Sequence, residues 1–234
     1  ERLEGSSYWM LTETPDLEGR NQARLLGGAW RDDDLTVRAQ YEQAQVNFNP
    51  EVGFVRRPSE TRRSGEFSWR PRPTNNKDIR NYILEGRSDF YTDDEGRPAT
   101  REHRATAGIS FQGSSSLTTS VTNTFERLVE PFPIRPTVVL PPGDYSYQRY
   151  AVNLNTDRSR VISGNVNANT GEFWSGTNSA ISGTLEFKPN YHLNVDVNFS
   201  YNRVDLPEGK FTTPLIGTRV VWGFTSKAFI NSFL

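Results

Sequence analysis

The sequence predicts an all-β fold: part of an antiparallel, up-and-down transmembrane β-barrel built from long strands. Three observations predict it. Apolar and polar residues alternate with a period of two, the alternating stretches are long, and short turns alternate with longer connections. We expect about 13 strands in a single domain over residues 1–234, as a fragment of a larger barrel.

The clearest strand is predicted at residues 191–201. One set of alternate positions is apolar: Tyr191, Leu193, Val195, Val197, Phe199 and Tyr201. The other set is polar: His192, Asn194, Asp196, Asn198 and Ser200. At ~3.3 Å per residue this strand would exceed ~30 Å, whereas a soluble strand has about 5–6 residues and a tilted barrel strand needs ~9–11. We therefore expect the apolar set to point outward and the polar set inward.

The same alternation predicts further strands and the connections between them. The strands lie around residues 35–42, 66–70, 82–89, 105–111, 181–187 and 218–224. Short turns are expected at 31–34, 71–76, 112–115, 155–158, 188–190 and 226–227, and longer connections at 47–61, 129–143, 169–176 and 203–210. Residues 93–96 form a tight turn on the side of the longer connections. This alternation is typical of a barrel with short periplasmic turns and longer outer loops.

Large aromatic side chains lie close to the predicted short turns. They are Trp30, Trp69, Phe111, Phe187, Tyr191, Trp222, Phe224 and Phe229. Aromatic rings favour the bilayer interface, where an apolar ring meets a wet edge. We interpret them as an aromatic girdle at one height; the alternative is a set of core aromatics that cap a soluble sheet.

Composition excludes several classes of protein. The 27 Lys and Arg residues nearly balance the 28 Asp and Glu residues, so no basic surface predicts a nucleic-acid partner. The chain has no cysteine and therefore no disulfide frame or thiolate metal site. No apolar run approaches the ~20 residues that a membrane helix needs. The first residues show no basic-then-apolar leader, so we expect an internal or processed piece of a longer protein.

No motif predicts an enzyme, a cofactor or a metal. His103 and His192 lack a partner at ligand spacing, and the acidic runs 32–34 and 93–96 lack the spaced ligands of a calcium loop. There is no Gly-x-Ser-x-Gly elbow, no Gly-x-Gly-x-x-Gly fingerprint and no Walker loop. A serine triad or a carboxylate pair would need coordinates to recognise.

Two groups of residues are candidates for a site. The first is a ladder of interstrand ion pairs on the inward parity, where near-balance of charge would suit a wet lumen. Its members are Arg38, Glu42, Glu66, Arg70, Glu85, Arg87, Asp89, Arg160, Glu186, Asp196 and Arg219. The second is a set of loop aromatics that could stack on a saccharide or simply pack the loops: Phe132, Tyr145, Tyr147 and Trp174.

Four stretches resemble a large family of uncharacterised bacterial envelope proteins. They are NFNPEVGFVRR at 47–57, FERLVEPF at 125–132, LPPGDY at 140–145 and VDLPEGKFTT at 204–213. Members of that family join a carbohydrate-binding-module family 9-like domain to a long β-rich domain of unknown function, which is expected to be an outer-membrane barrel. The resemblance runs from about Tyr8 to the end and implies the later part of such a protein. It implies no catalytic residue.

These observations lead to a leading hypothesis and two alternatives. The leading one is a barrel in the bacterial outer membrane, of unknown specific role but linked to glycan binding or uptake. Its partners would be outer-membrane lipid, a saccharide and other envelope proteins. The alternatives are a soluble β-sandwich that binds glycans and an envelope hydrolase. We also predict that residues 1–234 do not close a ring by themselves, because bacterial single-chain barrels have an even number of strands.

Overall fold

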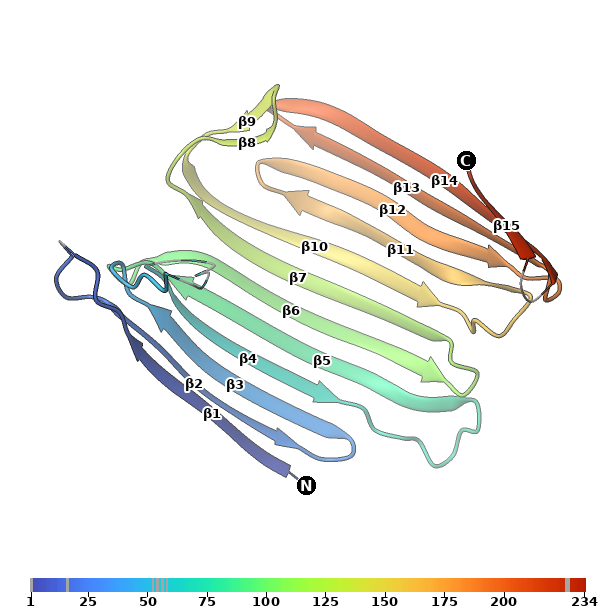
Figure 1. Ribbon diagram of the computed structural model, residues 1–234, viewed down its shortest axis with the longest axis horizontal. Helices are drawn as coiled ribbons and strands as arrows, with labels where there is room; N and C mark the ends of the chain where they lie inside the picture. The colour runs from blue at the N-terminus through green and yellow to red at the C-terminus, as the bar shows by residue number, and fades with distance from the viewer. Residues whose placement is uncertain are drawn as a thin grey trace.

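The protein is an open antiparallel sheet with one small hairpin (Figure 1), seen in a computed structural model that describes residues 2–15, 17–51, 53, 55, 57, 59–225 and 228–234. Thirteen strands lie side by side in the order β1-β2-β3-β4-β5-β6-β7-β10-β11-β12-β13-β14-β15. Their bounds are β1 Arg2–Leu11, β2 Gln22–Arg31, β3 Leu35–Ala44, β4 Thr61–Trp69, β5 Ile79–Thr92, β6 Pro98–Phe111, β7 Ser116–Leu128, β10 Gly143–Asn155, β11 Ile162–Phe173, β12 Gly176–Phe187, β13 Leu193–Leu206, β14 Gly209–Thr225 and β15 Ala228–Phe233. The prediction of an all-β antiparallel fold is therefore confirmed.

The sheet has two free edges. Every strand pairs with its neighbours along the chain, except that β8 (Phe132–Arg135) and β9 (Val138–Leu140) form a separate hairpin between β7 and β10. Within the described chain, β1 and β15 are not hydrogen-bonded to each other. The expectation that these residues alone do not close a ring is confirmed, while the barrel itself stays a prediction. The described residues contain no helix that is long and apolar enough to cross a membrane.

The connections at one edge of the sheet differ from the expected pattern. β11 ends at Phe173 and β12 begins at Gly176, and β13 ends at Leu206 and β14 begins at Gly209. The predicted longer connections at 169–176 and 203–210 are therefore wrong, and both are tight turns. Trp174 makes the first of them with a left-handed φ of 53°. The turn predicted at residues 226–227 lies outside the described residues.

The cross-strand registers divide the side chains between two faces. On one face, Val37 is opposite Phe67, Leu185 is opposite Val197, and Val197 is opposite Thr218. We call this the apolar face and the opposite one the polar face. Exposed apolar side chains on the apolar face include Leu3, Trp9, Leu26, Val37, Phe67, Trp69, Leu84, Leu117, Tyr150, Val152, Leu154, Ile162, Ile181, Leu185, Phe187, Tyr201, Ile216 and Trp222.

Aromatic side chains mark one end of the apolar face. Trp30, Trp69, Phe111, Phe187 and Trp222 all lie at or near the last residues of β2, β4, β6, β12 and β14. These strands run in the same direction in an antiparallel sheet, so their last residues lie along one edge of the sheet (Figure 1). We call this edge, where the five aromatic residues are found, the turn edge. The opposite edge, with connections 45–60 and 129–142, is called the loop edge.

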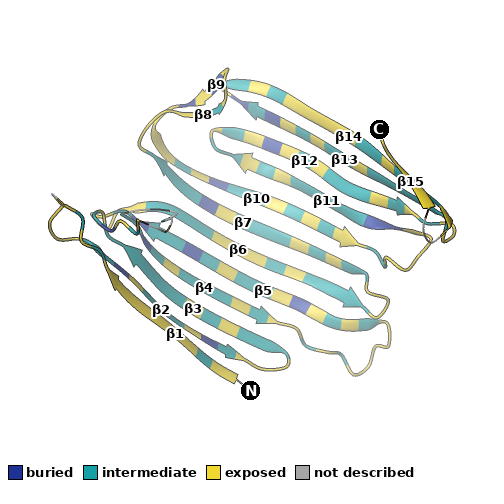
Figure 2. Cartoon of the chain, in the orientation of Figure 1, coloured by how far each residue is buried: buried dark blue, intermediate teal, exposed yellow. Residues whose placement is uncertain are grey.

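Among the described residues, a buried apolar cluster lies where the hairpin folds over the sheet. Figure 2 shows exposed and half-buried residues along most strands and few buried ones. The buried apolar cluster consists of Val138 and Leu140 of β9 with Val204 and Leu206 of β13, each at most 3% exposed. Val204 and Leu206 share the parity of Asn198 and Asn202. The hairpin therefore packs on the polar face, at the loop edge.

Candidate functional site

A ladder of ion pairs crosses the polar face of β3, β4 and β5. Arg38 Nη1 lies 3.3 Å from Glu66 Oε2, and Arg87 Nη1 lies 3.3 Å from Glu66 Oε1. Arg87 Nε donates to Asp89 Oδ2 at 2.7 Å. Arg62 binds the other carboxylate oxygen of Asp89 through Nε at 2.9 Å and Nη2 at 2.5 Å. One carboxylate is thus shared by two guanidinium groups, which is a strong, charge-assisted arrangement.

Two further pairs extend this ladder towards its ends. Arg62 Nη1 lies 3.7 Å from Glu42 Oε2, on the loop side. Arg70 Nη2 donates to Glu85 Oε1 at 2.5 Å, on the turn side. The structure therefore brings together Arg38, Glu42, Glu66, Arg87 and Asp89 of the predicted set, and Arg70 with Glu85 beside them. We call this network, which includes Arg62, the charged ladder.

Arg62 is a residue of the charged ladder that sequence reasoning missed, as it missed Tyr8 and Tyr91 beside it. It stands at the centre of the charged ladder because β4 begins at Thr61, earlier than the predicted strand. Its parity with Glu66 and Ser68 on the same strand was the signal that could have found it.

The other predicted ladder residues do not join this network. Arg160 pairs with Asp157 in the connection between β10 and β11, at 3.6 Å. Glu186 pairs with Lys188 and lies 4.0 Å from Arg158. Asp196 and Arg219 are cross-strand partners, yet no ion pair joins them among the described residues. Arg219 donates instead to Asn231 of β15 at 3.0 Å. The expectation of one ladder over all eleven residues is wrong, because several long side chains find nearer partners in turns or in the edge strand.

The Asp157 connection is held by local hydrogen bonds. The backbone N–H and the hydroxyl of Ser159 donate to Asp157 Oδ1 at 2.9 and 2.7 Å. These bonds, with the charge of Arg160, hold the pKa of the Asp157 carboxyl below its usual range. Asp157 and Arg160 therefore stabilise the connection between β10 and β11 and are not part of the network on the polar face.

Amide side chains, joined through Arg149, form a hydrogen-bond network on the polar face of β10 to β13. Arg149 Nη2 donates to Asn169 Oδ1 at 2.7 Å and to Asn178 Oδ1 at 3.2 Å. Asn178 Nδ2 donates to Asn202 Oδ1 at 2.6 Å. Thr184 and Asn198 form the next bond, at 2.7 Å. The polar face is thus charged on one half of the sheet and rich in amides on the other.

The four aromatics that were predicted to lie in loops come together around one ring, although Tyr145 and Tyr147 lie in β10 and not in a loop. The Trp174 ring centroid lies 5.9 Å from that of Phe132, 5.3 Å from that of Tyr145 and 5.8 Å from that of Tyr147. Phe173 adds a further edge contact with Trp174. These contacts flank the buried hairpin cluster, so the rings pack the hairpin onto the sheet. Of the two expectations for this set, the geometry favours loop packing over a saccharide platform.

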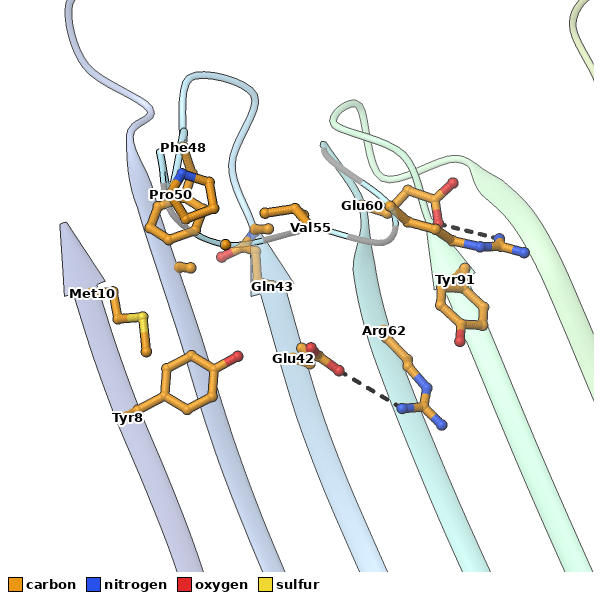
Figure 3. A pocket seen from close by; sticks show the side chains of 14 residues that line it. Tyr8, Met10, Glu42, Gln43, Phe48, Pro50, Val55, Glu60, Arg62 and Tyr91 are labelled. Atoms are coloured by element: carbon orange, nitrogen blue, oxygen red, sulfur yellow. Dashed lines mark hydrogen bonds and ion pairs between the residues drawn. The ribbon is translucent and has the colours of Figure 1, made fainter. Parts of the chain in front are cut away.

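A cavity of about 490 Å³ lies at the loop edge of the polar face, next to the charged ladder (Figure 3). Five successive cross-strand partners form a row along the cavity, from β1 to β5: Tyr8, Leu25, Glu42, Arg62 and Tyr91. All of them except Leu25 line the cavity. The volume is within the range of ~300–1,000 Å³ that is usual for ligand sites.

Described residues of the connection 45–60, among them Phe48, Pro50 and Val55, line this cavity from the loop side. Phe48 is 9% exposed, and Asn47 Nδ2 anchors the connection by donating to the carbonyl of Gly19 at 2.8 Å. Arg57 pairs with Glu60 at 3.3 Å and places its guanidinium 4.4 Å from the ring centre of Tyr91. The cavity therefore has a paired, charged side and an apolar side that includes Phe48, Pro50 and Val55.

No metal centre is visible in the part of the chain that the structure describes, since no three His, Cys, Asp or Glu residues there are grouped to hold an ion.

No protein-family model matches this sequence, and no curated protein matches it. The resemblance to the family of envelope proteins therefore stays a prediction, and the function rests on the geometry of the two faces.

Proposed function

We propose that this chain is part of the wall of a β-barrel in the bacterial outer membrane. The apolar face would contact lipid, and the polar face would line an aqueous lumen. A single observation carries the proposal: exposed apolar side chains cover one face of the sheet, and no described element packs against that face. Soluble monomers rarely expose so large an apolar surface.

The position of charge on the apolar face supports the proposal. Charged side chains on this face lie near the loop edge: Arg24, Arg63, Arg101, Arg127, Asp144, Glu172, Arg203, Asp205 and Lys210. Between them and the aromatic turn edge, the side chains of this face are apolar, small or uncharged. A charge-free band bounded by aromatics on one side and charges on the other matches an apolar belt ~25 Å tall.

Strand length also supports the proposal. Strands β5, β6, β7, β10, β13 and β14 have 14, 14, 13, 13, 14 and 17 residues. About 9–11 residues suffice to cross a bilayer at a tilt. Such strands would extend past the bilayer at the loop edge, where the charged side chains stand. Because unpaired backbone groups in lipid cost several kcal/mol each, the edges of β1 and β15 would pair with further strands.

Spin labelling can test which solvent each face meets. The chain has no cysteine, so single cysteines can be placed without background. Leu185 and Thr184 are adjacent on β12 and lie on opposite faces. In lipid vesicles, a nitroxide at Leu185→Cys should be relaxed by oxygen, which concentrates in lipid. A nitroxide at Thr184→Cys should be relaxed by a water-soluble nickel complex. Low accessibility of the Leu185 label to both reagents would show that protein covers the apolar face and would reject the proposal.

A further inference from the structure

The cavity beside the charged ladder carries an inference that does not depend on the membrane. It lies between the row Tyr8, Glu42, Arg62 and Tyr91 and the connection 45–60 (Figure 3). All four row residues are on the polar face. The groups that line the cavity are therefore the same whether lipid or protein covers the apolar face.

Charge in the cavity is balanced in pairs. The charged residues that line it are Glu42, Glu60, Arg57 and Arg62. Glu42 lies 3.7 Å from Arg62, and Glu60 lies 3.3 Å from Arg57. A cation or an anion would meet one favourable and one unfavourable charge in each pair. A neutral ligand can use the remaining lone pairs and N–H groups without upsetting this balance.

Three polar groups of the row have hydrogen-bonding capacity for a ligand. Among the described residues, the hydroxyls of Tyr8 and Tyr91 take part in no hydrogen bond of the structure, and the Glu42 carboxylate has the 3.7 Å ion pair with Arg62 but no hydrogen bond. Figure 3 shows the Tyr8 ring pointing toward Glu42, and the Tyr91 hydroxyl on the side of Arg62. The row thus presents an acceptor between two hydroxyls that each donate and accept.

The opposite side of the cavity is apolar. Met10 and Ala23 continue the sheet towards the loop edge, and Phe48, Pro50 and Val55 come from the connection. These groups cannot bond a hydroxyl, but they can contact C–H groups. The site therefore fits a ligand that has hydroxyls at its edge and apolar C–H faces, with no net charge.

We propose that this cavity binds a neutral saccharide ring. Its hydroxyls would bond Glu42, Tyr8, Tyr91 and the free N–H groups of Arg62, and its C–H groups would face Phe48, Pro50 and Met10. The proposal moves the expected saccharide site from the aromatic set around Trp174, whose rings pack on one another, to the polar face of β1 to β5.

The test uses the full chain, folded in detergent, and a panel of neutral hexoses, N-acetylhexosamines, pentoses and their disaccharides. Saturation-transfer NMR finds the saccharide that binds, and calorimetry measures its Kd. Glu42→Gln and Tyr8→Phe should each weaken binding about tenfold, because each removes a hydrogen-bonding function of the row. Glu66→Gln is the matched control: it changes a ladder carboxylate outside the cavity and should leave Kd within about twofold.

Charged sugars supply the second arm of the test. Glucuronate and glucosamine should bind more weakly than their neutral counterparts. The proposal is overturned if no neutral saccharide of the panel binds, if either charged sugar binds more tightly, or if Glu66→Gln weakens binding as much as Glu42→Gln does. Each variant is first shown to be folded by circular dichroism. None of these outcomes bears on which face of the sheet meets lipid, which the spin labels decide separately.

Discussion

At the scale of single residues, Arg62 joins the two parts of the charged ladder. It donates two hydrogen bonds to Asp89, and its side chain and that of Asp89 are only 24% and 11% exposed. Arg62→Met should lower the free energy of unfolding by about 1.5–3 kcal/mol, because Asp89 then keeps one guanidinium partner in place of two. Urea unfolding of the chain in detergent, followed by circular dichroism, measures the change.

Arg38 provides the control for this prediction. Its single pair with Glu66, at 3.3 Å, has side chains that are 42% and 38% exposed. Arg38→Met should cost less than ~1 kcal/mol, as is usual for exposed ion pairs. If both variants lost the same free energy of unfolding, the sharing of Asp89 by two guanidinium groups would not add to stability.

Adjacent residues of β13 test the division between the faces. Val195 lies on the apolar face, opposite Phe187 and Val220, and Asn194 lies on the polar face. If the apolar face meets lipid, Val195→Arg should cost ~2–4 kcal/mol, whereas Asn194→Arg should be milder. Reversible unfolding from lipid vesicles gives both values. A larger loss of unfolding free energy for Asn194→Arg than for Val195→Arg would contradict this prediction and indicate that the polar face of β13 is the one shielded from water.

At the scale of elements, the β8–β9 hairpin is held to the sheet by its own small core. Leu140 is fully buried among Val138, Val204 and Leu206. Leu140→Ala should destabilise the protein by about 2–5 kcal/mol, the usual loss when a buried leucine leaves a cavity. Thermal unfolding monitored by fluorescence suits this measurement in a background that keeps only Trp174, with the other four tryptophans changed to Phe, because Trp174 packs on the cluster.

The neighbouring Val139 is a matched control on the same strand. Its side chain is 44% exposed. Val139→Ala should change stability by no more than about 0.5 kcal/mol. A similar loss at both positions would show that the hairpin responds to strand propensity and not to burial.

A proline lies on the side of β14 that faces away from β13. Thr218 exchanges hydrogen bonds with Leu234 in both directions at 2.9 Å, so even-numbered residues of β14 direct their N–H groups away from β13. Pro214 shares this direction and has no N–H to donate. Pro214 therefore leaves one position on this side of β14 without a donor for a neighbouring strand.

At the scale of the whole molecule, the aromatic turn edge has a predicted depth. In lipid vesicles, a variant that keeps only Trp69, with Trp9, Trp30, Trp174 and Trp222 changed to Phe, should be quenched best by lipids brominated near the headgroup. The reason is that indole rings prefer the bilayer interface. Stronger quenching by lipids brominated at the chain ends would put the turn edge at mid-bilayer and contradict the girdle.

Much of this architecture was predictable from the sequence, because strand geometry ties each residue to a face. Alternation located β3, β5, β6, β12 and the first part of β13, and it placed Leu193, Val195 and Val197 on one face with Asn194, Asp196 and Asn198 on the other. It also predicted about as many strands as the 13-stranded sheet has, and that the ring is open, but it missed the β8–β9 hairpin. The aromatic edge followed from the spacing of Trp30, Trp69 and Trp222 to the short turns.

Tertiary structure decided what alternation could not show. At Val204 and Leu206 the apolar residues change to the polar face, because the hairpin covers them there; a sequence pattern read alone ends the strand at that point. The pairing of long side chains likewise depends on which partners lie within their reach on neighbouring strands. Arg62 pairs with Asp89 and Glu42, whereas Arg219 donates to Asn231. The sequence determined the faces, since a period of two is a property of the strand itself. The cavity and the ladder needed the register, since they join residues from β1 to β5 that only pairing brings into one row.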